Sequence, residues 1–221
     1  MSDLPVLVIL SGSGHLDGSE VREAVILLLA LDRSGLRVQI AAPDMPQLHV
    51  VDHLTGAVVP GETRNVLMEA ARIARGQIVA LAGVDPAHYA GVFLPGGFGA
   101  AKNLSTLALR GPVGAVQPDV ARVLQGFHAQ GKPIGAVCIA PALVVRALGE
   151  GEVTVGDDAR TASTIRAMGG SHVECPVDVM HVDRARKIVT APAYMYGDAS
   201  ISGVARGIEA AVAAFKELLP S

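Results

Sequence analysis

Cys138 lies between two different sequence patterns, and its surroundings are compatible with a reactive thiol. A short apolar run, 134–137, precedes it, and a stretch with helical periodicity, 140–148, follows at once. A thiol at the start of a helix faces free N–H groups and the positive end of the helix dipole, which favour the thiolate. Small neighbours such as Gly135 and Ala140 would let the chain turn sharply and leave the sulfur accessible. A structural buried thiol fits the same residues, so both interpretations stay open.

Two other segments that follow predicted strands carry groups that could act on this thiol. Glu20 begins the first predicted helix, where a carboxylate is electrostatically favoured, and a simple helix-end charge is the commoner explanation. The alternative is a carboxyl aimed at Cys138, with a raised pKa, that donates a hydrogen bond to sulfur. Gly96 and Gly97 could offer N–H groups to an oxyanion, although Pro-Gly-Gly alone predicts only a tight turn.

Several other activities are disfavoured by motif spacing. The segment 12–17 reads Gly-Ser-Gly-His-Leu-Asp and therefore fails the G-x-G-x-x-G pattern of dinucleotide sites. His15 in that loop could reach a pocket, but a solvated loop histidine is the simpler interpretation. His172 and Glu174 form an H-x-E pair, whose spacing from the cysteine is wrong for a glutamine amidotransferase triad. The two cysteines are far apart and lack nearby ligands, so we expect neither a metal nor a cofactor.

Composition limits the possible partners and location. The 221 residues carry a net charge of −3, with scattered basic residues, three tyrosines, four phenylalanines and no tryptophan, so nucleic-acid binding is not expected. No apolar run is long enough to span a membrane, and residues 1–10 lack the features of a signal peptide. We therefore expect a soluble cytoplasmic protein.

Apolar runs alternate with helical patterns along the chain, which predicts an α/β fold with a mostly parallel sheet and helices on both faces. Residues 1–221 are expected to form a single domain. The predicted strands or extended segments are 5–10, 37–42, 48–59, 77–81, 91–94, 134–137, 152–155, 172–176, 179–182 and 187–191, and the predicted helices are 19–34, 63–75, 118–130, 140–148, 161–168 and 200–219. Segment 99–118 is the longest one without a pattern and is a candidate flap over the site.

The first predicted helix, 19–34, has an N-cap candidate in Ser19. Its broad apolar face is predicted to comprise Val21, Ala24, Val25, Leu28, Leu29 and Leu31. Because ligands collect beyond the carboxyl ends of strands in open α/β sheets, segments 11–20, 95–103 and 136–141 are expected to converge on one pocket.

Six segments together resemble one known family. They are SGSGHLDGSE (11–20), HLTG (53–56), ETRNVLMEAARIARG (62–76), LPGGFGAAKNLS (94–105), GKPIGAVCIAPAL (131–143) and KIVTAPAYM (187–195). The chain resembles the ElbB family of isoprenoid-biosynthesis-associated glyoxalases, called ES1 in animals. This family belongs to the PfpI-like superfamily, which includes the class I glutamine amidotransferase domains.

The resemblance implies a flavodoxin-like three-layer sandwich with Cys138 on a nucleophile elbow and Glu20 as its carboxyl partner. It implies that Gly96 and Gly97 belong to the oxyanion loop, and that Lys102 and Asn103 lie near the same pocket. It also implies a homodimer.

The resemblance further implies a weak, glutathione-independent glyoxalase-type lyase that converts glyoxal and water to glycolate. In this interpretation the thiolate attacks an aldehyde carbon, Glu20 moves a proton through an enediolate, and the thioester is hydrolysed. N–H groups of Gly97 and Ile139 would stabilise the developing negative charge.

Departures from related families keep alternatives open. Ile139 stands where peptidases of the superfamily carry a histidine after the nucleophile, which puts proteolysis in doubt. A redox-sensing or regulatory binding protein could use the same thiol without turnover, since a cysteine of low pKa is oxidised readily. A partner protein of isoprenoid metabolism without its own activity is a third possibility.

Overall fold

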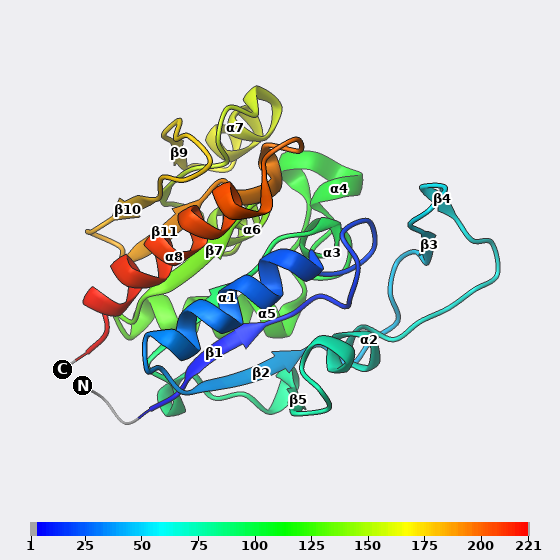
Figure 1. Ribbon diagram of the computed structural model, residues 1–221, viewed down its shortest axis with the longest axis horizontal. Coiled ribbons are helices and arrows are strands. Elements are labelled where there is room, and N and C mark those ends of the chain that lie inside the picture. The colour runs from blue at the N-terminus through cyan, green and yellow to red at the C-terminus, as the bar shows by residue number, and fades with distance from the viewer. Residues whose placement is uncertain (1–3, 221) are drawn as a thin grey trace.

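Strands buried on both faces form the centre of the protein. The computed structural model describes residues 4–220, in which helices cover both faces of one twisted sheet (Figure 1). Its seven strands are β1 (Val6–Ile9), β2 (Val38–Ala42), β5 (Ile78–Ala80), β6 (Gly91–Leu94), β7 (Ile134–Val137), β10 (His181–Asp183) and β11 (Ile188–Ala191). Their order is β10-β11-β7-β6-β1-β2-β5, and every pair is parallel except β10–β11. The prediction of a flavodoxin-like α/β sandwich with a mostly parallel sheet is confirmed.

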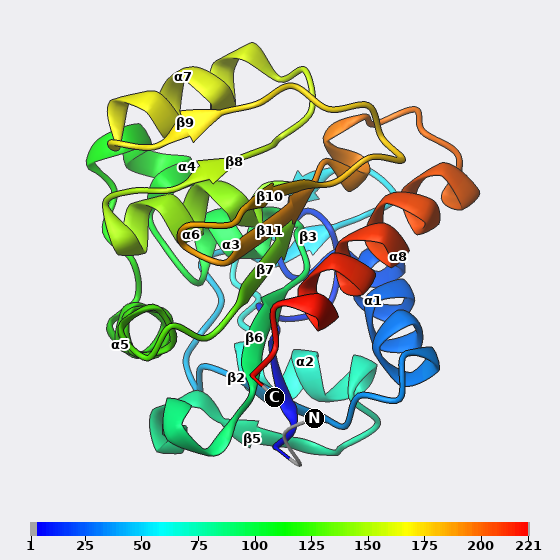
Figure 2. The same cartoon turned by 90° about the vertical axis from the view of Figure 1, so that its left-hand side faces the viewer.

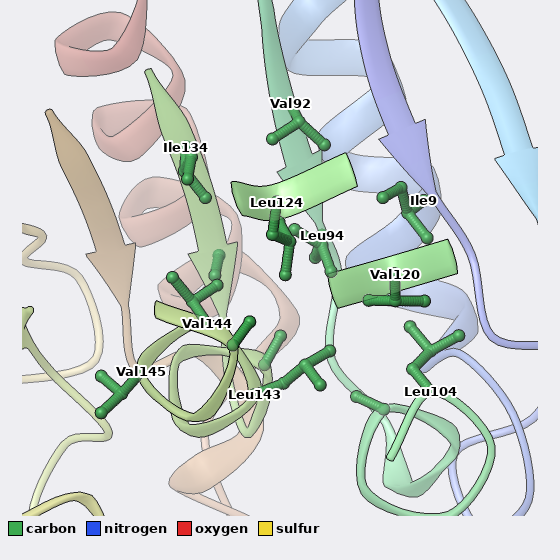
Figure 3. Packing of buried hydrophobic residues seen from close by; sticks show 14 of the residues in the cluster. Ile9, Val92, Leu94, Leu104, Val120, Leu124, Ile134, Leu143, Val144 and Val145 are labelled. Carbon is green, nitrogen blue, oxygen red and sulfur yellow. The ribbon is translucent and has the colours of Figure 1, made fainter. Parts of the chain in front are cut away.

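Alternate residues of the central strands enter two separate cores. On β1, Leu7 and Ile9 contribute to one core, whereas Val6 and Val8 contribute to the other. The first core lies under α5 (Pro118–Ala129) and α6 (Ala140–Leu148), as Figure 3 shows for part of it. The second lies under α1 (Val21–Arg33), α2 (Val66–Ile73) and α8 (Ile201–Glu217). The two layers of helices are seen on opposite sides of the sheet in Figure 2.

Most of the remaining elements lie around the carboxyl ends of the strands: α3 (Phe98–Lys102), α4 (Leu107–Arg110), α7 (Ala159–Ala167) and the hairpin of β3 (Val51–Asp52) and β4 (Ala57–Val58). The pair β8 (Glu152–Val153) and β9 (Ser171–His172) lies beside the edge of the sheet, where the N–H of Glu152 donates to Asp183 on β10. Short 3-10 turns occupy Leu81–Gly83, Pro86–His88, Gly111–Val113 and Ala193–Met195. None of the helices within residues 4–220 has the length and apolar character to cross a membrane.

Two local predictions are wrong. Segment 99–118 is not patternless, because it contains most of α3, all of α4 and the turn Gly111–Val113; these helices are too short to show a period of 3.6 residues. The helix α1 is capped by Glu20 rather than by Ser19, whose hydroxyl is buried and accepts the N–H of Ser11 at 2.9 Å.

Tight packing at the centre of the sheet gives a first prediction. A Cβ added at Gly135 on β7 would lie 2.4 Å from the ring of Phe93, which is fully buried on the neighbouring strand and packs on Phe215. Gly135→Ala should lower the free energy of unfolding by about 1–3 kcal/mol, because a close-packed aromatic core has no room to shift. Urea denaturation measures the change in the free energy of unfolding. The control Gly83→Ala places its Cβ in open space, and equal midpoints for both variants would contradict the packing argument.

Candidate active site

Cys138 occupies a strained turn between β7 and α6. Its φ of 60° is in the left-handed region, which for a residue other than glycine costs on the order of 1–3 kcal/mol. Its N–H donates to the carbonyl of Ala191 at 3.0 Å, which extends the pairing of β7 with β11 by one residue. The next residue, Ile139, is the N-cap of α6. The predicted sharp turn from strand to helix is therefore present, with the side chain of Cys138 between the strand ends and the first turn of a helix.

A buried carboxyl contacts the thiol, and it belongs to Glu23. The Cys138 thiol donates a hydrogen bond to the Glu23 carboxylate. One carboxylate oxygen, Oε2, also accepts the N–H of Gly96 at 2.8 Å, and Oε1 accepts the N–H of Tyr194 at 3.0 Å. Glu23 has no exposed surface. The segments that follow β1, β6, β7 and β11 thus meet at one carboxyl group.

Burial sets the protonation of this pair. Desolvation is the main cause that raises the pKa of Glu23 to about 7, against the N–H donors of Tyr194 and Gly96. Desolvation, followed by the negative charge of Glu23, raises the pKa of the Cys138 thiol well above its ordinary value. The N–H groups of Gly97 and Ile139 oppose this rise without cancelling it. The expectation of a thiol that is ionised at neutral pH is therefore wrong, because burial outweighs the helix dipole.

Glu20, the expected carboxyl partner, has a different place. Its Oε2 accepts the N–H of Glu23 at 2.6 Å as the N-cap of α1, which turns the side chain back along its own helix. It still lines the cavity that contains Cys138. The contact that we assigned to Glu20 is made one helical turn later, by Glu23.

The sequence did hold a signal for Glu23. The buried stripe of α1 comprises Glu23, Ala24, Leu27, Ala30 and Leu31. Our predicted face included Val21, Val25 and Leu29, which are 42%, 51% and 44% exposed. A glutamate within the stripe that packs on the sheet indicates a functional carboxyl. Glu23 was missed because the predicted apolar face of this helix did not include it.

The backbone N–H groups of the two glycines in the Pro-Gly-Gly segment donate to different acceptors. The N–H of Gly97 donates to the sulfur of Cys138, whereas the N–H of Gly96 donates to Glu23. Both positions require glycine. A Cβ at Gly96 would lie 2.3 Å from that of Cys138, and Gly97 has a φ of 94°. The N–H groups that point at the sulfur are therefore those of Gly97 and Ile139, and the assignment of Gly96 to oxyanion binding is corrected, because its N–H is taken by Glu23.

Lys102 and Asn103 do not line the cavity, contrary to expectation. Lys102 Nζ donates to the carbonyl of Leu16 at 2.9 Å. The Nδ2 of Asn103, which is buried, donates to the carbonyls of Ser11 and Asp17 at 2.9 and 2.8 Å. Both side chains therefore fasten the loop 11–19 that leads into α1. They position the site rather than contact a ligand.

A cavity of about 500 Å³ opens over Cys138. Its lining includes Glu20, Gly97, Phe98, Leu107, Ile139, Ala142, Arg160, Thr161, Thr164, Tyr194 and Met195. His15 also lines it, so this loop histidine does reach the pocket, while His172 and Glu174 do not. Among residues 4–220, no group of three or more histidine, cysteine and acidic side chains is placed to hold a metal ion.

Comparison with known proteins gives the family. No protein-family model matches the sequence. A mitochondrial "glutamine amidotransferase-like class 1 domain-containing protein 3" of Homo sapiens is 49% identical over 199 residues, which are 86% of this chain and 74% of that protein. A solved structure from Ehrlichia chaffeensis, described as an isoprenoid biosynthesis protein with an amidotransferase-like domain, superposes with a TM-score of 0.92. It is 38% identical and covers 97% of this chain and 99% of its own.

The chain belongs to the ElbB (ES1) family. The mitochondrial ES1 protein of Danio rerio agrees, being 34% identical over 207 residues, 86% of this chain and 77% of that one. More distant structures such as Drosophila melanogaster DJ-1beta, with a TM-score of 0.52 and 20% identity, share the fold alone. The expectation of a cytoplasmic protein is overturned, because the human, rat and zebrafish members of the ES1 family are named as mitochondrial proteins.

The raised pKa of Glu23 predicts how stability changes with pH. Since this pKa is about 7 in the folded protein against an ordinary 4.5, the folded state holds the proton more tightly. The resulting stabilisation is complete below pH 4.5 and is lost as the pH rises through 7. One pKa unit corresponds to about 1.4 kcal/mol. As the pH rises, the free energy of unfolding of wild type should therefore fall by up to about 3 kcal/mol relative to that of Glu23→Gln.

Urea denaturation at pH 4 and pH 8 measures this difference. The variant Glu217→Gln, at an exposed glutamate on the last turn of α8, is the control and should follow wild type at both pH values. A gap between wild type and Glu23→Gln that does not change with pH would show that the carboxyl is not desolvated as described.

Proposed function

We propose that this protein is a cofactor-independent glyoxalase-type enzyme that converts a small dicarbonyl and water to a 2-hydroxy acid through a thioester on Cys138. One observation carries the proposal: the thiol of Cys138 lines an open cavity, beside two N–H donors, and is hydrogen-bonded to a buried carboxyl whose pKa burial raises to about 7. A group with a pKa near the working pH is suited both to accept and to return a proton.

The first step joins the thiol to an aldehyde. As the sulfur of Cys138 attacks the aldehyde carbon of glyoxal, Glu23 takes the thiol proton, so the buried pair keeps a single negative charge until the S–C bond forms. That charge then passes to the aldehyde oxygen, which the N–H groups of Gly97 and Ile139 can receive. Return of the proton from Glu23 gives a neutral hemithioacetal.

The second step moves a hydrogen between the two substrate carbons. Glu23 lies behind the sulfur, and its two oxygens are held by backbone N–H groups. Glu20 lies on the cavity wall, so we assign to it the removal of the proton from the carbon bonded to sulfur and its return to the neighbouring carbon. The enediolate between these events becomes a thioester. Water then cleaves the thioester, which releases glycolate and a proton and restores the thiol.

The alternative roles receive less support from the site. A peroxide-sensing cysteine needs a standing thiolate and exposure to solvent, whereas the pKa of Cys138 is raised and its side chain is 8% exposed. The proposed enzyme needs ionisation only while the substrate is attacked, and Glu23 is placed to receive the proton. The Ehrlichia chaffeensis relative is described as an isoprenoid biosynthesis protein, and we extend that association to this chain as part of the proposal.

Replacing the cysteine tests the proposal directly. Cys138→Ala should abolish the formation of glycolate from glyoxal, measured by chromatography, because no other group can form the thioester. The control Cys175→Ala removes the only other thiol, which is buried and does not line the cavity, and should keep the wild-type rate. Glycolate formation that persists in Cys138→Ala would contradict the covalent mechanism.

The role of Glu20 gives a separate prediction. Glu20→Gln should lower kcat by about 10²–10⁴-fold, the usual contribution of a positioned acid–base group, because hydrogen transfer between the carbons loses its base. With glyoxal that carries deuterium on both carbons, the variant should show a larger isotope effect on kcat than wild type. An unchanged kcat would assign the hydrogen transfer to another residue.

A further inference from the structure

The cavity over Cys138 is much larger than glyoxal requires. It encloses about 500 Å³, within the range of roughly 300–1,000 Å³ that is typical of sites for ligands of drug size. Glyoxal has two carbons and two oxygens, and even a whole water molecule takes up only about 30 Å³ in the liquid. A substrate as small as glyoxal would therefore leave most of the cavity to solvent.

The walls of this cavity are fixed rather than collapsible. The segment with α4 and the turn Gly111–Val113, which forms one wall, is fastened at both ends. Thr106 N–H donates to the carbonyl of Ala115 at 2.9 Å, and Gln117 N–H donates to that of Leu104 at 2.9 Å. Arg146 on α6 binds the carbonyl of Gly114. Figure 2 shows α4 beside α7 and α6 in this arrangement. The volume is thus preformed, and segment 99–118 has the contacts of a wall rather than of a loose flap.

An aromatic face is held in place beside the thiol. Phe98, the first residue of α3, lines the cavity and is 48% exposed. The ammonium group of Lys102 lies 5.4 Å from the centre of its ring, and the same group is anchored to the carbonyl of Leu16. Leu107, Ile139 and Met195 add further apolar surface to the lining. An exposed aromatic ring that is fixed from behind favours a flat apolar ligand group.

We propose that the substrate of this site is a 2-oxoaldehyde that carries an aromatic or similarly sized apolar group, which lies against Phe98 and Leu107 while the aldehyde meets Cys138. This inference rests on the proposed glyoxalase-type reaction and adds its substrate class. The hydroxyl of Thr161 and the guanidinium of Arg160, both on α7, make another part of the lining polar and can donate hydrogen bonds to oxygen atoms on the ligand. Thr164 also lines this part, but its hydroxyl donates to the carbonyl of Arg160 at 3.1 Å.

Phenylglyoxal is the simplest compound of this class. The sulfur of Cys138 adds to its aldehyde carbon, and the hydrogen on that carbon moves to the neighbouring carbon, which bears the phenyl ring. The product of this shift is the thioester of mandelic acid. Water cleaves the S–C bond, so the sum is phenylglyoxal and water to mandelate and a proton, with no oxidant or reductant.

The experiment compares kcat/KM for phenylglyoxal and glyoxal in four forms of the full chain. Wild type should favour phenylglyoxal by about tenfold or more, which corresponds to about 1.4 kcal/mol. Ala108→Trp, which fills the cavity from α4, should lower kcat/KM for phenylglyoxal much more than kcat/KM for glyoxal and so remove this preference, because the smaller substrate needs less of the filled volume. Leu109→Trp is the matched control, since its side chain is exposed on the same helix and does not line the cavity. Phe98→Ala should also reduce the preference.

The outcomes separate this inference from the reaction on which it rests. If Cys138-dependent turnover occurs with equal kcat/KM for both substrates, the substrate class is wrong and the reaction stands. If neither compound is turned over, the affinity for the two product acids tests the substrate class. Cys138→Ala is then titrated with mandelate and with glycolate by calorimetry, since neither acid reacts with side chains. Tighter binding of mandelate that Ala108→Trp abolishes supports the ligand class even without the reaction, and equal or absent binding overturns it.

Discussion

The strained backbone of Cys138 is the constraint on which the site depends. Pairing of β7 with β11 extends through its N–H, and α6 begins two residues later, so the chain must change direction within a single residue. A φ of 60° achieves this at a cost on the order of 1–3 kcal/mol, which the buried strands on each side offset. The result is a sulfur that leaves the sheet at its carboxyl edge and faces the first N–H groups of a helix. No regular strand or helix conformation would place it there.

The second constraint is electrostatic, and it explains why so many segments converge. A buried carboxyl beside a buried thiol is tolerated only if the pair carries at most one negative charge and its oxygens are hydrogen-bonded. Gly96 and Tyr194 provide the hydrogen bonds from two different strand ends. The loop 11–19, which leads into the helix that carries Glu23, is fastened in turn by Asn103 and Lys102. These two side chains matter to the thiol although neither contacts the cavity.

The sheet could be predicted from the sequence because parallel strands buried on both faces appear as short apolar runs that end at glycine or proline. For β6, β7 and α6 the predicted bounds match the structure residue for residue. The site was harder to predict than the sheet, because α1 is apolar on nearly every side. Eight of its thirteen residues form the unbroken run of alanine, leucine, isoleucine and valine at 24–31, so periodicity alone does not choose the face that packs on the sheet. The partner of the cysteine, Glu23, depends on that choice.

Under the proposed reaction, the same cavity has to accept both a carbonyl compound and the water that cleaves the thioester. A site that closed tightly over a two-carbon substrate would raise the pKa of the thiol still further and would leave no space for that water. A preformed cavity of about 500 Å³ avoids the conflict, because an apolar group on the substrate can cover Phe98 and Leu107 while part of the space stays hydrated. In this proposal the excess volume and the protonated thiol are linked: burial would keep the sulfur protonated until a substrate arrives, and the open volume would supply the water that releases the product.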